Sequence, residues 1–241
     1  MMRIWVLLVI MCTTLSAQAG VMSASTRVIY DAAQREKSLM LNNTNTYPVI
    51  VQSWVDDGSG DPVNAKAPFI VLPAVFRLLP GKTQAIRIIY NQERLPEDRE
   101  SMFWLNLYEI PPLTGREGND PRITLAMNTQ IKLFFRPKNM SMSSTEAIDK
   151  LSFTLLSSAG KYYIECKNPG PFHISFTSLL LSNDKIKKTV NNKNYLILKP
   201  FETLKLPVDI SANDARSGRV VFRYIDDIGA NREKEFPLAL K

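Results

Sequence analysis

Apolar and polar residues alternate along most of this chain, and this two-residue period restricts the fold more than any other feature. Short alternating runs recur between residues 26 and 238, with turn residues between them at short intervals. No long stretch has the 3.6-residue period of a helix. A period of two puts every second side chain on one face of a strand. The sequence therefore predicts an all-β fold of packed sheets.

The expected strands fall into two sets that are separated by a polar stretch. The first set covers residues 26–30, 38–42, 49–55, 69–79, 83–90, 102–110 and 123–135. The second set covers residues 151–156, 162–166, 173–181, 195–198, 202–208, 218–224 and 234–238. Seven strands in about 110 residues are typical of an immunoglobulin-like sandwich, and a proline after a strand is a common stop. We expect an N-terminal immunoglobulin-like domain over residues 20–136 and a C-terminal one over residues 137–241.

The first 19 residues are expected to be a signal peptide rather than part of the fold. Arg3 gives a positive head, residues 4–11 are all apolar, and Ala17-Gln18-Ala19 is a small-x-small cleavage site. The alternative is a membrane anchor, but this apolar stretch is well short of the ~20 residues that a spanning helix needs. We expect cleavage after Ala19, a mature chain that starts at Gly20, and no stable membrane insertion.

Cysteine and charge further restrict the possible partners. Cleavage removes Cys12, so Cys166 is the only cysteine of the mature chain and no intramolecular disulfide is possible. Alternation places Cys166 on one face with Tyr162 and Ile164, which favours a buried apolar residue over a reactive thiol. The formal net charge is +7. Its cations are scattered and the leader exports the chain, so nucleic acid is not expected as a partner.

Few residue combinations in this sequence suit catalysis. His173 is the only histidine, and its place at the start of an expected strand favours a structural role. The chain has no G-x-S-x-G, no phosphate-binding glycine loop and no H-E-x-x-H. Asp226 and Asp227 leave two-carboxylate chemistry open, although neighbours in a strand point to opposite faces. We expect a protein that is not an enzyme and that uses no cofactor or metal.

The expected strand 123–135 carries the most informative pattern. Ile123, Leu125 and Met127 place three large apolar groups on one face of what is expected to be an edge strand. If they face their own core, the strand is ordinary. If they project outward, the edge suits β-augmentation by another chain. Lys132 has the opposite parity, where a lysine is costly unless it reaches a cleft or an anion.

Residues 95–112, with the sequence LPEDRESMFWLNLYEIPP, resemble the signature of the periplasmic pilus assembly chaperones, the PapD-like chaperones of the chaperone–usher pathway. Every constrained position of that signature is acceptably filled. Supporting matches are TRVIY at 26–30, FRLLPG at 76–81, IKLFFRP at 131–137 and YIDDIG at 224–229. The resemblance implies a periplasmic boomerang of two immunoglobulin-like domains that binds fimbrial subunits and delivers them to an outer-membrane usher.

The resemblance also implies a subunit-binding site. A pilus subunit is an incomplete sandwich that lacks its final strand, and Ile123, Leu125 and Met127 match the alternating residues that fill its groove by donor-strand complementation. Arg27 and Lys132 match the pair that holds the subunit's C-terminal carboxylate. Two fixed cations bind a carboxylate by charge-assisted hydrogen bonds and thereby set the register of the added strand.

A second implied feature is an ion network between the domains. Glu100, Arg136 and Asp227 match its members, and Asp226 is the alternative to Asp227. The network is expected to set the angle between the two sandwiches.

Two other functions remain as alternatives at this point. An exported immunoglobulin-like adhesin or pilus subunit would use the same edge strand for self-assembly, but it is expected to have one incomplete domain and a donor extension. A secreted carboxylate-based hydrolase would show turnover.

Overall fold

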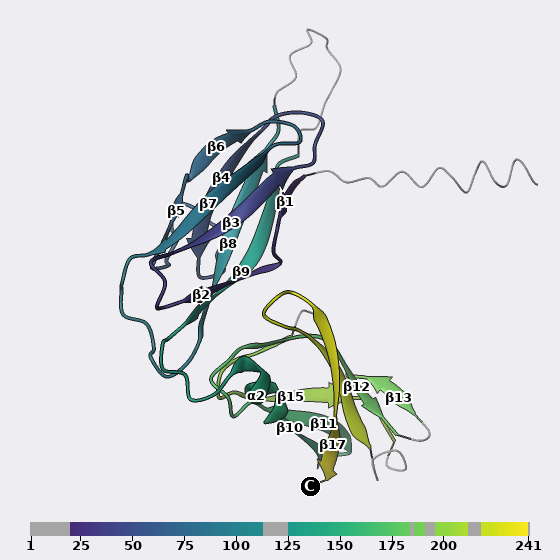
Figure 1. Cartoon of the computed structure of the whole chain (residues 1–241). Helices are drawn as coiled ribbons and strands as arrows, with labels where there is room; N and C mark the ends of the chain where they lie inside the picture. The colour runs from purple at the N-terminus through teal and green to yellow at the C-terminus, as the bar shows by residue number, and fades with distance from the viewer. Residues whose placement is uncertain (1–19, 113–124, 184–185, 191–195, 212–217, 241) are drawn as a thin grey trace, which may run out of the picture.

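The structure, a computed structural model, describes residues 20–112, 125–183, 186–190, 196–211 and 218–240. Two β-sandwiches are joined at an angle, which gives the molecule a bent outline (Figure 1). The only helix in the described part of the chain is α2 (Ser144–Asp149). The expected all-β, two-domain fold is confirmed. The expected signal peptide and Ile123 lie outside the described residues.

The N-terminal sandwich consists of two sheets that enclose one core. One sheet has the order β1 (Val21–Ser23), β3 (Glu36–Asn43), β7 (Thr83–Tyr90) and β5 (Phe69–Leu72). The other has the order β2 (Arg27–Asp31), β9 (Met127–Arg136), β8 (Ser101–Ile110), β4 (Val49–Asp56) and β6 (Val75–Leu78). Leu41 and Ile86 of the first sheet, and Leu105 and Leu133 of the second, are fully buried in this core. The alternating residues of both sheets therefore meet face to face, as the period of two predicts.

One expected strand of this domain is wrong. Residues 69–79 were expected to be continuous, but β5 pairs with β7 in one sheet and β6 pairs with β4 in the other. Pro73 has no N–H with which to continue a ladder. The carbonyl of Ala74 instead accepts a hydrogen bond from the Ser53 amide of β4, at 2.7 Å. The chain therefore changes sheet at this point.

The C-terminal sandwich contains eight strands, with bounds as follows: β10 (Ser152–Ser158), β11 (Lys161–Lys167), β12 (Ile174–Ser182), β13 (Lys187–Thr189), β14 (Leu196–Leu198), β15 (Thr203–Val208), β16 (Arg219–Ile225) and β17 (Asn231–Leu240). β17 pairs with β16 over residues 231–237 and then with β10 in parallel over residues 238–240. One strand thus hydrogen-bonds to both layers of the sandwich.

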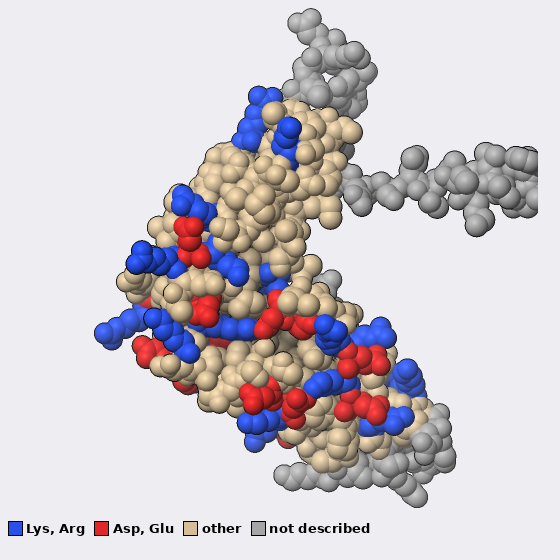
Figure 2. Space-filling model, in the orientation of Figure 1, with Lys and Arg blue, Asp and Glu red and all other residues tan. Residues whose placement is uncertain are grey.

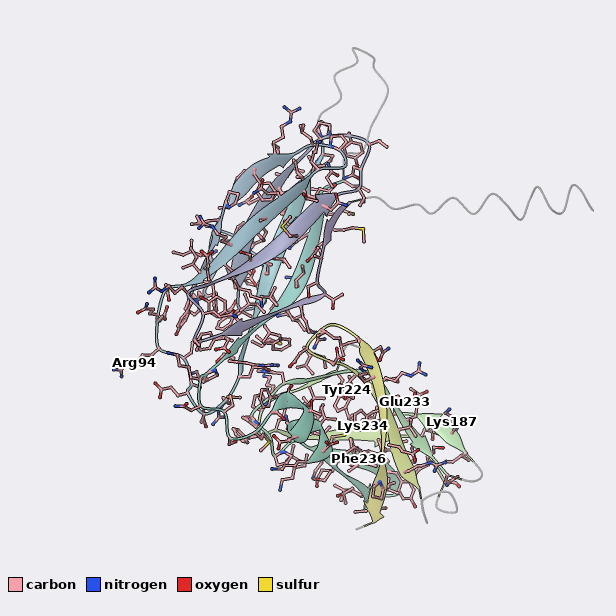
Figure 3. All side chains as sticks on the ribbon, viewed as in Figure 1. Arg94, Lys187, Tyr224, Glu233, Lys234 and Phe236 are labelled. Atoms are coloured by element: carbon pink, nitrogen blue, oxygen red, sulfur yellow. The ribbon has the colours of Figure 1, made fainter. Side chains whose placement is uncertain are left out.

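The short helix α2 follows the N-terminal domain and was not expected from the sequence. Its N-cap, Ser143, forms a capping box with Glu146, which satisfies two N–H groups at the helix start. Lys234 of β17, which is labelled in Figure 3, forms an ion pair with Asp149 at the helix end. This ion pair ties the helix to the sheet. Six residues are too few for a helical period to emerge from the sequence.

Cys166 lies in the core of the C-terminal domain. It is fully buried, as is its neighbour on the same face, Ile164, while Tyr162 packs against the same cluster. Burial, with a smaller contribution from the charge of Glu165, raises the pKa of the Cys166 thiol to about 12. The expectation of a buried apolar residue is confirmed.

We expect the Cys166 thiol to be inert in the folded protein, because the thiolate is the reactive form and burial disfavours it. In a chain that starts at Gly20, and therefore lacks Cys12, iodoacetamide at pH 8 should leave the native protein unmodified. After unfolding in guanidinium chloride it should alkylate one site, as measured by intact mass. Alkylation of the native protein at the rate of the unfolded chain would contradict this account.

Candidate functional site

Arg27 and Lys132 lie side by side between the two domains. β2 and β9 pair in parallel with Arg27 opposite Lys132. Arg27 is 8% exposed, and its Nη1 donates a hydrogen bond to the carbonyl of Ile225 at 2.8 Å. The Nζ of Lys132 lies 3.5 Å from the hydroxyl of Ser175. Ile225 and Ser175 belong to the C-terminal sandwich, so both cations reach across the junction.

The surroundings of this pair favour an anion. Burial lowers the pKa of Arg27, and burial together with the charge of Arg27 lowers the pKa of Lys132. The Nε of Arg27 is buried and has no hydrogen-bond partner among the described residues. Two cations that are partly removed from water, one of them with a spare donor, suit a ligand with negatively charged acceptor oxygens.

β9 has an open edge directly beyond this pair. β2 covers β9 only over residues 132–136, whereas β8 covers it over residues 127–135. In the described part of the chain, no strand pairs with the other side of residues 127–131. The expected position at a sheet edge is therefore right for the first half of β9 and wrong for the second half, where β2 lies outside it.

The exposure of Leu125 and Met127 shows whether their side chains face their own core or project outward. Leu125 is 75% exposed and Met127 is 48% exposed. Ile131 and Leu133 have the same parity, yet they are only 4% and 0% exposed. The alternating row therefore enters the domain's own core only from Ile131 onward. Leu125 and Met127 lie beyond the region that β2 covers and remain accessible. Ile123 lies outside the described residues.

The opposite face of β9 is held by a polar network. Asn128 and Gln130 donate hydrogen bonds to the side-chain oxygen of Asn106, at 3.0 and 2.9 Å. Asn106 in turn donates to Asp56 at 2.9 Å, and Trp54 donates to the same carboxylate at 3.1 Å. Asp56 and Asn106 are fully buried. The open half of β9 is thus fixed from behind by a satisfied buried network.

Glu100, Arg136 and Asp227 come together at the junction of the domains. The Nε of Arg136 donates to Glu100 at 2.9 Å, and its two terminal nitrogens donate to Asp227 at 2.7 and 2.6 Å. Glu100 also accepts a hydrogen bond from the amide of His173 at 2.9 Å, and Ser144 donates to Asp227 at 2.8 Å. The network therefore links the residue before β8 and the last residue of β9 to three segments of the C-terminal domain.

Arg136 and Asp227 stabilise each other's charged forms. Burial opposes ionisation of Asp227, but the hydrogen bonds and charge of Arg136 outweigh it and lower the pKa of Asp227. Burial likewise opposes the charge of Arg136, whose pKa is nevertheless raised by Asp227 and Glu100. Asp226, the alternative member, binds the exposed Arg232 instead. Figure 2 shows positive and negative side chains in contact at the junction, while much of the visible N-terminal surface is uncharged.

Several residues of this site could not be identified from the sequence. His173, Ser144 and Ser175, as well as the carbonyl of Ile225, contribute contacts across the domain junction. They are far from their partners in the chain, and no spacing rule connects them. The structural role expected for His173 fits its hydrogen bonds to Glu100.

The fold and site together define a class: a two-domain immunoglobulin-like protein with an open edge strand and a cationic pair at its junction. The family described as the pili and flagellar-assembly chaperone, PapD N-terminal domain, matches residues 20–141. The family described as the pili assembly chaperone PapD, C-terminal domain, matches residues 146–236. The chain therefore belongs to the family of PapD-like pili assembly chaperones.

Individual relatives agree with this assignment over nearly the whole chain. The chain is 34% identical over 215 residues to the chaperone protein LpfB of Salmonella typhimurium, covering 89% of this chain and 87% of that protein. The crystal structure of the YadV chaperone is 32% identical, with a TM-score of 0.77, covering 90% of this chain and 99% of that one. The SafB–SafA chaperone–pilin complex of Salmonella enterica gives 26% identity and a TM-score of 0.74, covering 93% and 99%.

Family membership decides between the functions left open by the sequence. The matching families are chaperones, so the alternative of an adhesin or pilus subunit is set aside. No helix in the described ranges is long and apolar enough to cross a bilayer.

The network at the junction predicts acid sensitivity. Because the folded pKa of Asp227 is below its unfolded value of about 3.9, its stabilisation is complete above that value and is lost as the pH falls through the folded pKa. We expect the angle between the domains, followed by small-angle scattering, to be constant from pH 7 to about 5 and to become heterogeneous below about 4. The Asp227→Asn variant should already be heterogeneous at pH 7, whereas the exposed Asp57→Asn control should behave as wild type. An unchanged scattering profile for Asp227→Asn would refute this role.

Proposed function

We propose that this chain is a periplasmic chaperone that binds pilus subunits by donor-strand complementation and delivers them to an outer-membrane usher. One observation carries the proposal: Arg27 and Lys132 are neighbours in register, directly below the open edge of β9. The family supports the partner class, because one solved relative holds a pilin. The usher follows from the same family and from no particular residue of this chain.

In this mechanism the subunit strand is bound at two kinds of contact. Its terminal carboxylate accepts hydrogen bonds from Arg27 and Lys132, while its backbone pairs with the open side of residues 127–131. Met127 lies five residues above Lys132, about 17 Å at 3.3–3.4 Å per residue. The anchor therefore fixes which subunit residues face Ile123, Leu125 and Met127, since a slip of one residue would turn every side chain to the other face.

The two kinds of contact contribute comparable free energies. A hydrogen bond to a charged group is worth about 1.5–3 kcal/mol. Full burial of a leucine or methionine side chain contributes about 1.5–3 kcal/mol. Leu125 is still 75% exposed and Met127 48% exposed, so a bound strand could bury most of the first side chain and about half of the second. Loss of either kind should therefore weaken subunit binding by about 10- to 100-fold. Binding energy alone drives the process, so no ATP or cofactor is needed.

We also propose that the chain divides into a leader over residues 1–19 and domains over residues 20–136 and 137–241. The support for the second boundary is that β9 ends at Arg136, whose side chain enters the ion network. Arg136 would thus end one domain and fix its angle to the other.

We infer that the chain has no catalytic activity. Asp226 and Asp227 are each engaged by an arginine, which opposes the proton exchange that two-carboxylate hydrolysis requires. The proposed function consists of binding and release.

The carboxylate anchor is tested with a synthetic peptide of alternating apolar residues, made with either a free C-terminal carboxylate or a C-terminal amide. We expect wild-type protein to bind the free acid about 10- to 100-fold more tightly by calorimetry. Arg27→Ala and Lys132→Ala should each reduce this preference, because each variant removes one of the two cations that bind the carboxylate but not the amide. Equal binding of the two peptides by wild-type protein would refute the anchor.

Matched variants separate the anchor from general effects. Arg87→Ala removes an exposed arginine of β7 and should keep the preference for the free acid. Leu125→Glu should weaken both peptides equally, while Ile70→Glu on the other sheet should weaken neither. Arg27 also bonds the C-terminal domain, so circular dichroism and scattering must show that its variant is folded. If the Arg27→Ala variant is not folded, the result with Lys132→Ala decides the test.

Processing is tested separately by intact mass of the protein isolated from periplasm. We expect a chain that starts at Gly20, because the small-x-small triplet precedes that bond. A species that retains Met1 would contradict both the leader and the periplasmic location.

A further inference from the structure

We propose that the buried carboxylate of Glu109 is a binding site for the chain's own mature N-terminus, the α-ammonium group of Gly20. The inference rests on the proposed cleavage after Ala19. Cleavage would create an ion pair between Gly20 and Glu109 that the uncleaved chain cannot form.

The first residue of the proposed mature chain is held in a closely fitting site. The Gly20 nitrogen donates a hydrogen bond to the side-chain oxygen of Asn45 at 3.0 Å. The Gly20 carbonyl accepts from the amide and hydroxyl of Thr44, at 3.0 and 2.8 Å. The next amide, that of Val21, donates to Glu109 at 2.8 Å. Gly20, Asn45 and Glu109 are all buried.

Glu109 is the unusual member of this site. Its side chain accepts hydrogen bonds from Val21 and from Asn45, the latter at 2.7 Å, and the residue is only 6% exposed. No lysine, arginine or histidine of the described ranges lies within ion-pair distance of it. A buried carboxylate is stabilised by a cation or by full hydrogen bonding. Asp56, which is also buried without a cation, accepts four hydrogen bonds, whereas Glu109 accepts two. Glu109 therefore keeps acceptor positions for a further donor.

Cleavage supplies a cation at this place. A Cβ built on Gly20 would lie 3.6 Å from the carboxylate of Glu109, so that carboxylate adjoins the residue whose nitrogen is released. Hydrolysis of the 19–20 bond consumes one water and yields a carboxylate on Ala19 and an amine on Gly20. An α-amine has a pKa of about 7.7–8.0 and is mostly charged at neutral pH. One of its three N–H donors would keep the hydrogen bond to Asn45, and the other two would be available to Glu109.

The same site adjoins the strand that is proposed to bind subunits. Glu109 of β8 is the cross-strand neighbour of Met127, the first residue of β9. The Met127 methyl carbon would lie 3.3 Å from a Cβ on Gly20, and Gly20 has a φ of +124°. Glycine therefore suits this position on two counts. The ion pair would hold the open end of β9 against the N-terminus, so processing would position Met127.

The test compares two chains made with a removable tag that leaves either Gly20 or Ala19 as the first residue. The longer chain moves the amine by one residue, about 3.8 Å. We expect the chain that starts at Gly20 to have a Tm higher by several degrees. In the Glu109→Gln background the two chains should have equal Tm values, whereas the exposed Glu97→Gln control should preserve the difference. Equal Tm values with Glu109 intact would overturn the proposal.

A second measurement covers the case in which Glu109→Gln fails to fold. The α-amine of the Gly20 chain should react with an acylating reagent at pH 7 about 10-fold more slowly than that of the Ala19 chain, because the amine is buried and paired. Equal rates would also overturn the proposal. Both measurements use the free protein with a defined first residue. A failure therefore leaves subunit capture and cellular processing, which have their own tests, unaffected.

Discussion

The parallel pairing of β2 with β9 is the interaction on which the rest of the structure depends. It begins at Arg27 opposite Lys132 and ends at Asp31 opposite Arg136. Because it begins there, two cations become neighbours at the domain junction, and residues 127–131 of β9 keep one edge open. Because it ends there, Arg136 leaves the sheet beside Glu100 and Asp227. One short ladder thus aligns the cationic pair, the open edge and the domain angle.

The ion network and the cationic pair at the junction differ in whether their surroundings favour the charged forms of their residues. In the ion network, one guanidinium is shared by two carboxylates, and the charged forms of Arg136 and Asp227 are both favoured. In the cationic pair, burial and mutual repulsion disfavour the charge of Lys132. A network whose charges are compensated stabilises the protein by itself. In Arg27, the charges of Asp227, Asp226 and Glu100 offset part of the effect of burial. A carboxylate bound between Arg27 and Lys132 would favour the charged forms of both residues further.

The sequence predicted features that depend on local pattern or on family resemblance. The period of two gave most strands, and the resemblance named the residues that meet at the junction. The crossing at Pro73 was missed because residues 69–79 are apolar apart from Arg77, so the hydrophobic pattern does not mark a change of sheet. The helix α2 was too short to show a period. The contacts of His173, Ser144 and Ser175 depend on how two separately folded domains meet, which no local pattern encodes.

An open edge strand carries a risk of aggregation, which natural proteins limit by keeping such edges short and well fixed. The described open edge of β9 spans residues 127–131 and is held from three directions. Below it, β2 closes the ladder at Lys132. Behind it, the network of Asp56 and Asn106 binds Asn128 and Gln130. Above it, the methyl group of Met127 lies so close to Gly20 that a Cβ built there would be 3.3 Å from it. An edge held in this way keeps its strand geometry without a partner. Binding therefore does not have to order this segment, and the entropy cost that a flexible loop would have on binding is reduced.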